Sequence, residues 1–189
     1  MTGDPNSPRL WPPERDRKLE RYPRDRWASH PSLDVAFWLE VHSRFRIQCA
    51  ELIALTDEYR QQRLPLRELA IVATPRVAGL LTDLRGHHQI EDHHYFPVFR
   101  RLVPTLGEGI DVLERDHAEL DRDSFALGNA ERELRAVAVG GGSGTGPATA
   151  TIAGRRFVAA ANTLCTHILR HLADEEDLVV PLLIEQTPS

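Results

Sequence analysis

The stretch that decides the fold is His87-His88-Gln89-Ile90-Glu91-Asp92-His93-His94-Tyr95-Phe96-Pro97, in which four histidines stand beside two acids. Its skeleton recurs near the C-terminus as His171-Leu172-Ala173-Asp174-Glu175-Glu176-Asp177-Leu178-Val179-Val180-Pro181. Both stretches read His-x3-Glu-acid-x4-Pro. In an α-helix, residues four apart lie on one face, about one turn apart. Each stretch therefore predicts a helix that points an imidazole and a carboxylate in the same direction, which is a donor pair for a metal ion.

The sequence around these two stretches has a helical pattern. Residues 33–63 contain no glycine or proline, carry apolar side chains at helical spacing and follow Ser32, a suitable N-cap. His42 falls in that apolar stripe and is expected to face the core. Three further long helices are predicted over residues 75–97, 110–139 and 148–184.

Prolines and glycines mark the ends of these helices. Pro75 suits the first turn of the second helix, and Pro97 should kink or end it. The glycine-rich residues 140–147 read as a flexible linker between the third and fourth helices. No segment alternates as a strand does. Four long helices predict an all-α fold, an up-down antiparallel four-helix bundle.

Length and composition bound the organisation of the chain. With 189 residues, one domain is expected, with the bundle over residues 32–189. Residues 1–31 are rich in proline, arginine and aspartate, which predicts an irregular, flexible N-terminal arm. Cys49 and Cys165 belong to no Cys-x-x-Cys motif and are expected to be buried free thiols in a reducing compartment.

Charge and hydropathy argue against nucleic acid and a membrane as partners. The net charge is -5, and the chain has no basic stripe with interleaved aromatic residues, so nucleic acid is not expected as a partner. No apolar run approaches the ~20 residues that a membrane span needs. Without an apolar leader at the N-terminus, a cytoplasmic location is expected. The sequence leaves the oligomeric state open and is compatible with a monomer.

The two halves of the chain form a weak internal repeat. Each half has a lone histidine on its first helix, His42 or His117, followed by one copy of the His-x3-Glu motif. A bundle with a pseudo-two-fold axis and a metal ion on each side of it would follow. Imidazoles and carboxylates without cysteine ligands suit iron, manganese or zinc.

With these motifs the chain resembles hemerythrin-like proteins of the HHE cation-binding family. The resemblance covers about residues 33–184 and rests on a motif in each of the four helices: Glu40-Val41-His42-Ser43-Arg44-Phe45-Arg46, His87-x3-Glu91-Asp92-x3-Phe96-Pro97, Glu114-Arg115-Asp116-His117 and His171-x3-Glu175-Glu176. The family implies a centre of two non-haem iron ions inside an up-down four-helix bundle.

The resemblance also implies a set of ligands. His42 and His87 would bind one iron, and His117 and His171 the other. Glu91 and Glu175 would bridge the two irons. Glu176 competes with Glu175 for this role, and we favour Glu175 because it repeats the spacing of Glu91 and lies on the face of His171.

The chain departs from the family pattern at Asp121. Family members often have a second histidine four residues after the one at His117, and this chain has Asp121 there. Its carboxylate can be a direct ligand or can lie outside the ligand set. As a ligand it would favour ferric over ferrous iron and would argue against simple reversible oxygen carriage.

Further histidines flank the proposed ligands. His94 lies two turns after His87, and His167 lies one turn before His171. Each is a candidate ligand, with a surface or mouth position as the alternative for His94 and a hydrogen-bonded core position for His167. His88 and His93 are rotated away from His87 by about 100° or more and are expected to lie outside the ligand set.

A di-iron centre of this kind implies a protein that binds or senses O2, NO or peroxide. One alternative, suggested by the departure at Asp121, is a di-iron enzyme that turns over peroxide or nitric oxide. The other is an iron-responsive regulatory protein. Beyond the ligands the sequence shows no catalytic base, substrate cleft or nucleophile motif.

Overall fold

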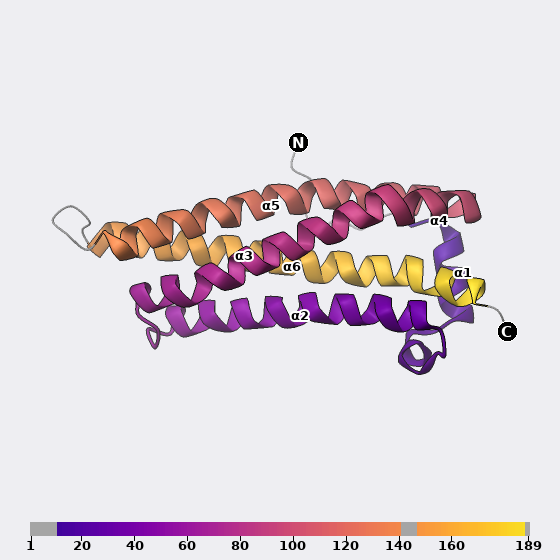
Figure 1. Cartoon of the computed structure of the whole chain (residues 1–189), viewed down its shortest axis with the longest axis horizontal. Helices are drawn as coiled ribbons and strands as arrows, with labels where there is room; N and C mark the ends of the chain where they lie inside the picture. Colours follow the sequence, from indigo (N-terminus) through magenta and orange to yellow (C-terminus); the bar gives the residue numbers. More distant parts are fainter. Residues whose placement is uncertain (1–10, 141–146, 188–189) are drawn as a thin grey trace. The chain divides into compact units, whose positions relative to one another are not determined.

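The computed structural model describes residues 11–140 and 147–187, and within them every regular element is helical (Figure 1). This confirms the all-α prediction. The elements are α1 (Pro13–Arg21), the 3-10 helix η1 (Arg24–Ser29), α2 (Leu33–Arg60), α3 (Leu66–Ile90), the π-helix η2 (Glu91–Tyr95), α4 (Phe96–Leu102), the 3-10 helix η3 (Pro104–Leu106), α5 (Gly107–Val139) and α6 (Pro147–Gln186). None of the described helices has an apolar stretch long enough to cross a membrane.

The ends of α2 follow from side-chain and backbone capping. At its start the Val35 N–H donates to Ser32 Oγ (3.4 Å) and the Ala36 N–H to the Ser32 carbonyl (3.1 Å), so Ser32 is the N-cap that the sequence predicted. At its end Gln62 takes a left-handed φ of 59°, and the Arg63 N–H returns to the Glu58 carbonyl (2.9 Å). This closure satisfies carbonyls that the helix end would otherwise leave open.

The start of α3 corrects the sequence prediction. The helix begins at Leu66, and Pro75 lies inside it instead of in its first turn. A proline inside a helix removes one hydrogen bond, here to the carbonyl of Ile71. Pro75 and Ile71 are both exposed, so water can satisfy that carbonyl, while Thr74 Oγ1 donates to the Ala70 carbonyl (2.8 Å).

The N-terminal segment is more ordered than the irregular arm that its composition predicted. Residues 1–10 lie outside the described residues, but 13–21 and 24–29 are helical. Trp27 is buried and its Nε1–H donates to the Tyr22 carbonyl (2.8 Å). The local pattern missed this order because tertiary contacts stabilise it. Most of the predicted linker, residues 141–146, also lies outside the described residues.

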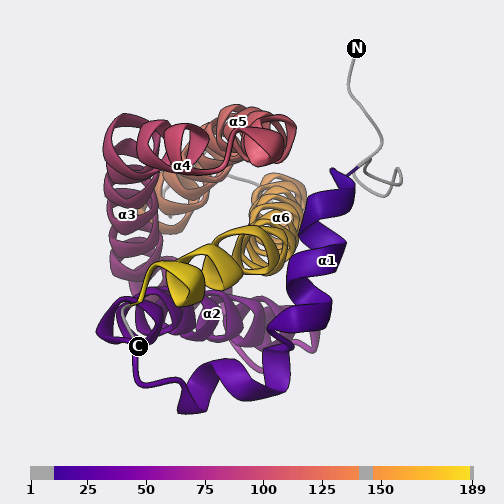
Figure 2. The same ribbon diagram turned by 90° about the vertical axis from the view of Figure 1, so that its right-hand side faces the viewer.

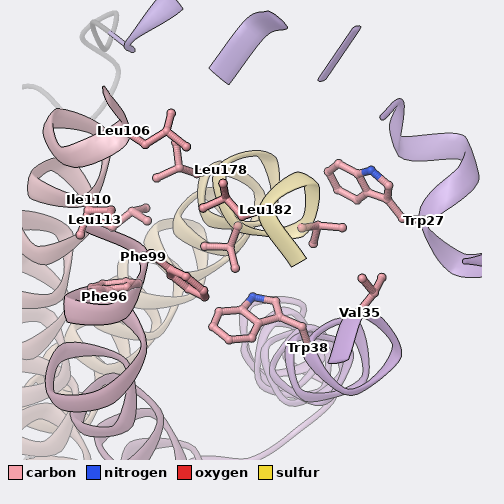
Figure 3. Close-up of a cluster of buried hydrophobic side chains, with 12 residues drawn as sticks. Trp27, Val35, Trp38, Phe96, Phe99, Leu106, Ile110, Leu113, Leu178 and Leu182 are labelled. Carbon is pink, nitrogen blue, oxygen red and sulfur yellow. The ribbon is translucent and has the colours of Figure 1, made fainter. Parts of the chain in front are cut away.

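The chain divides into two compact units. The first unit comprises Met1–Arg44, His88–His117 and Leu169–Ser189, and the second comprises Phe45–His87 and Ala118–Ile168. In the first unit α1 runs beside the last turns of α6 (Figure 2). Its core includes Trp38 and Phe99, whose ring centroids are 6.1 Å apart (Figure 3). The buried cluster also contains Trp27, Val35, Phe96, Leu106, Ile110, Leu113, Leu178, Val179, Val180 and Leu182.

The second unit has its own core, with a few polar contacts between helices. Asn162 Nδ2 of α6 donates to Thr56 Oγ1 of α2 (3.4 Å), and the Thr74 hydroxyl of α3 is shared between the Ala70 carbonyl and Glu131 Oε1 of α5 (2.6 Å). Cys49 and Cys165 are buried free thiols, as the sequence predicted. Gly154 of α6 lies so close to α2 that an added Cβ would be 2.1 Å from Tyr59 Oη.

We predict opposite effects of alanine at two helical glycines. Gly79→Ala should raise the free energy of unfolding by up to about 1 kcal/mol, because the position is open and alanine favours helix. Gly154→Ala should lower it by about 1–3 kcal/mol, because the Tyr59 ring must move. Urea unfolding measures both. Equal stabilisation by the two substitutions would show that Tyr59 does not pack on Gly154.

Candidate metal centre

Histidines and glutamates, most of them buried, form two sets of potential metal donors. In one set, donor atoms of His42, Glu91 and Glu175 lie within 4.8 Å of one another. His87, one helical turn before Glu91 on α3, is the fourth member of this set. The second set consists of His88, His117 and His171, again with donor atoms within 4.8 Å.

The two glutamates connect these sets. Glu175 Oε2 lies 3.5 Å from His42 Nε2, in the first set, and 3.5 Å from His171 Nε2, in the second. Glu91 Oε2 lies 3.4 Å from His117 Nε2. His117 Nε2 and His171 Nε2 are themselves 3.2 Å apart. Each glutamate therefore reaches histidines of both sets, as a carboxylate that bridges two cations must do.

Three of the histidines have an acid against the ring nitrogen that faces away from the centre. Glu176 Oε1 is 3.0 Å from His42 Nδ1, and Asp92 Oδ1 is 2.8 Å from His117 Nδ1. Asp116 Oδ2 is 3.5 Å from His171 Nδ1. A carboxylate at Nδ1 fixes the tautomer and the ring orientation and leaves Nε2 directed at the metal. Glu176 thus lies behind His42, while Glu175 faces the other donors.

Aromatic contacts hold the same rings from the side. The His88 and His117 rings stack with centroids 3.9 Å apart and planes 12° apart. Phe96 stacks on His117 with ring centroids 5.4 Å apart, and the Trp38 and His42 ring centroids are 5.8 Å apart. These neighbours limit the rotation of the imidazoles and separate them from bulk water.

The central motif passes through a π-helix at Glu91–Tyr95, in which the Phe96 N–H donates to the Glu91 carbonyl five residues earlier. The next residue, Pro97, lacks an N–H, and its ring would clash with the His93 carbonyl in an α-helix. A π turn is wider and accommodates it. After the second motif, α6 passes Pro181 without such a turn.

The histidines that flank the proposed ligands differ in their exposure. His94 and His93 are exposed, because the wider turn rotates His94 away from the face that carries His87. His88 was expected to lie outside the ligand set, but it is 4% exposed and forms a potential donor set with His117 and His171. Adjacent residues on a helix point about 100° apart, so His87 and His88 serve different donor sets.

Asp121 belongs to neither of the two donor sets. Its side chain is exposed, and Leu120, 1% exposed, takes the buried position after His117. His167 is also outside both sets: its Nδ1 pairs with Asp123 of α5, the hydrogen-bonded alternative that the sequence left open. The imidazole that Asp121 seemed to replace is instead available from His88.

The electrostatics of the centre fit a cation. Burial raises the pKa of Glu91 well above its usual range, and the charge of Glu175 and a hydrogen bond to it raise it further. Burial also lowers the pKa of His117, as does the nearby His171, while Asp92 opposes this change. A cation between the two glutamates would allow both to ionise, and it would bind the neutral imidazoles. The nitrogen and oxygen donors suit iron, manganese or zinc.

The fold and the site define an all-helical protein with a buried histidine and carboxylate cluster for metal ions. The chain belongs to the hemerythrin HHE cation-binding domain family, whose sequence model matches residues 33–183. The resemblance seen in the motifs is thereby confirmed, and with it the class of metal-binding protein. No curated protein and no solved structure gave a significant match. The segment Pro13–Ser29 precedes the matched residues.

We predict that His88→Ala weakens metal binding and that Asp121→Ala does not. His88 is buried among the donors, so its loss should lower affinity about tenfold or more, whereas Asp121 is exposed. Competition with a coloured chelator measures the affinity of both variants. Strong loss in Asp121→Ala together with normal binding in His88→Ala would contradict the placement of these two residues.

The raised pKa of Glu91 predicts a pH effect on the metal-free protein. An acid with a higher pKa in the folded state holds its proton there at a pH where the unfolded chain has released it. The contribution of Glu91 to the free energy of unfolding should therefore fall progressively as the pH rises above about 4.5, until the pH reaches the raised pKa of Glu91.

Chemical unfolding with chelator present, over pH 4 to 8, tests this effect. Glu91→Gln removes the titrating group, so the variant should gain stability relative to the wild type as the pH rises. A constant difference between the two proteins across this range would show that Glu91 has an ordinary pKa.

Proposed function

We propose that this chain is a non-haem di-iron protein of the hemerythrin type that binds or senses O2, NO or peroxide. The observation that supports this best is the pair of donor sets connected by Glu91 and Glu175. When bound, an iron pair supplies redox-active Lewis-acid sites for a small diatomic molecule or peroxide.

The proposed ligands follow the two donor sets. His42 and His87 would hold one iron, and His117 and His171 the other, with His88 beside them. Glu91 and Glu175 contact histidines of both sets and would supply carboxylate oxygens to both irons. Glu175 is preferred over Glu176 because the Glu176 carboxylate contacts His42 Nδ1.

The protein contributes orientation and exclusion of water. The acids at Nδ1 of His42, His117 and His171 keep the opposite nitrogen of each ring directed inward. All three histidines are at most 4% exposed, so a ligand at the centre meets little competition from bulk water. Such a closed site favours binding of small molecules over reactions with bulky substrates.

The proposal includes a particular arrangement of the helices. We propose that α2, α3, α5 and α6 form an up-down antiparallel four-helix bundle over residues 32–189. This is the arrangement in which four helices can each contribute inward-facing ligands to one centre. A cytoplasmic location, consistent with free Cys49 and Cys165, belongs to the same proposal.

An iron-responsive regulatory role is the second candidate. The hydrogen-bonded pair Glu91 and Glu175 is buried, so removal of the metal leaves two acids that cannot both ionise without cost. Metal binding would then stabilise the first unit, and this change in stability could be sensed by a partner. The enzyme alternative was based on Asp121 as a possible iron ligand, and the exposed position of Asp121 does not support it.

We predict that the chain takes up two irons. Anaerobic loading with Fe²⁺, removal of excess metal and metal analysis should give two irons per chain. Addition of O2 should then produce new near-ultraviolet absorption bands. The Glu175→Ala variant should retain little more than one iron per chain and should lack these bands, because Glu175 contacts histidines of both sets. The Asp121→Ala variant should retain two irons per chain and the bands.

Parallel loading with Mn²⁺ and Zn²⁺ identifies the preferred metal. A single zinc per chain, or no bound metal, with an unchanged spectrum would contradict the di-iron proposal. A long-lived spectral change after O2 would support binding or sensing, and rapid loss of added peroxide would support the enzyme alternative.

A further inference from the structure

The segment that precedes the family-matched residues is tied to the ligand-bearing end of α6. We name this segment, Pro13–Ser29, the strap; it consists of α1 and η1. Arg15 Nη2 pairs with Asp177 Oδ2, and Arg24 Nε donates to Asp177 Oδ1 (2.6 Å) while Arg24 Nη2 pairs with the second oxygen. The Asp177 side chain is only 1% exposed, whereas the Arg15 side chain is 14% and the Arg24 side chain 64% exposed, so the two arginines pair with a buried carboxylate from its solvent side.

Asp177 belongs to the turn of α6 that carries two acids of the metal centre. Consecutive helical residues point about 100° apart, so Glu175, Glu176 and Asp177 project in three directions. Glu175 points to His171 and His42, Glu176 to His42 Nδ1, and Asp177 to the strap. The strap thus contacts this turn of α6 through Asp177, while Glu175 and Glu176 of the same turn face the candidate metal centre.

The strap is anchored at two more places. Lys18 Nζ, in a side chain 7% exposed, pairs with Glu185 further along α6. Trp27 is 5% exposed and joins the same buried cluster as Trp38, which contacts His42. The strap therefore combines a hydrophobic anchor with ion pairs at two levels of α6, and only the pairs with Asp177 lie next to the ligands.

We propose that the strap is a positioning element of the metal centre, in which Arg15 and Arg24 fix the turn of α6 that presents Glu175 and Glu176. Both arginines neutralise a carboxylate that would otherwise be buried without a counter-charge. The fork of Arg24 contacts both oxygens of Asp177 and so fixes its orientation as well as its charge.

Its consequence for function rests on the proposed metal centre. Small displacements of Glu175 change its distance to both His42 and His171. Loss of the strap contacts should therefore loosen metal retention at the centre, although Arg15 and Arg24 touch no proposed ligand. A protein with the matched domain alone would lack this support.

The test compares the contacts of the strap with Asp177 and its contact with Glu185. Arg15→Ala/Arg24→Ala removes the pairs with Asp177, and Lys18→Met removes the pair with Glu185 while keeping an apolar stem. Arg24→Lys keeps the charge but loses the fork, and it remains informative if the double variant does not fold. Backbone amide exchange of the full-length, metal-free chain and the absorption spectrum after Co²⁺ loading are measured for each protein.

We expect amide exchange over residues 172–180 to rise about tenfold in the double variant and by a smaller factor in Arg24→Lys. Lys18→Met should raise exchange only beyond residue 181 and leave the Co²⁺ spectrum unchanged, whereas the arginine variants should alter it. Unchanged exchange over 172–180, or an equal rise throughout the chain in all variants, would overturn the proposal. If the wild type takes up no Co²⁺, the proposed function fails, and the exchange data still decide the role of the strap.

Discussion

The contact between the buried carboxyl groups of Glu91 and Glu175 is the constraint on which the first unit depends. Two acids at a position with almost no exposure cannot both be charged unless a cation or a proton lies between them. The surrounding imidazoles are donors that bind a cation when neutral. A cation bound by these donors would offset the cost of burying the two acids together.

Successive shells of side chains surround Glu91 and Glu175, and each shell has a different role. The histidines contact the glutamates, and Glu176, Asp92 and Asp116 contact the far sides of the histidines. Aromatic side chains pack beside the rings, and the strap holds the α6 turn through Asp177. Each layer restricts the one inside it, so the positions of the donors are determined well beyond the residues that would bind metal.

Helical periodicity was enough to predict much of this arrangement. The spacing of four residues in His87 to Glu91 and His171 to Glu175 predicted one-sided donor pairs, and the structure brings these four together with His42 and His117. Ser32 was predicted as an N-cap because its capping bond is local.

What the sequence did not predict depends on tertiary context. His88 was assigned to the wrong side because its 100° offset from His87 was measured against one metal site, whereas two adjacent sets use both directions. The π turn before Pro97 was not predicted, because Pro97 was expected only to kink or end the helix. The strap was missed because its order comes from Asp177 and Glu185, more than 150 residues away in sequence.

Anomalous X-ray diffraction from crystals of the iron-loaded protein, recorded on both sides of the iron absorption edge, tests the central claim most directly. We expect two iron peaks, one beside His42 and His87 and one beside His117 and His171, with Glu91 and Glu175 in contact with both. A single peak, no iron peak among these residues, or a peak bound by Asp121 would contradict it.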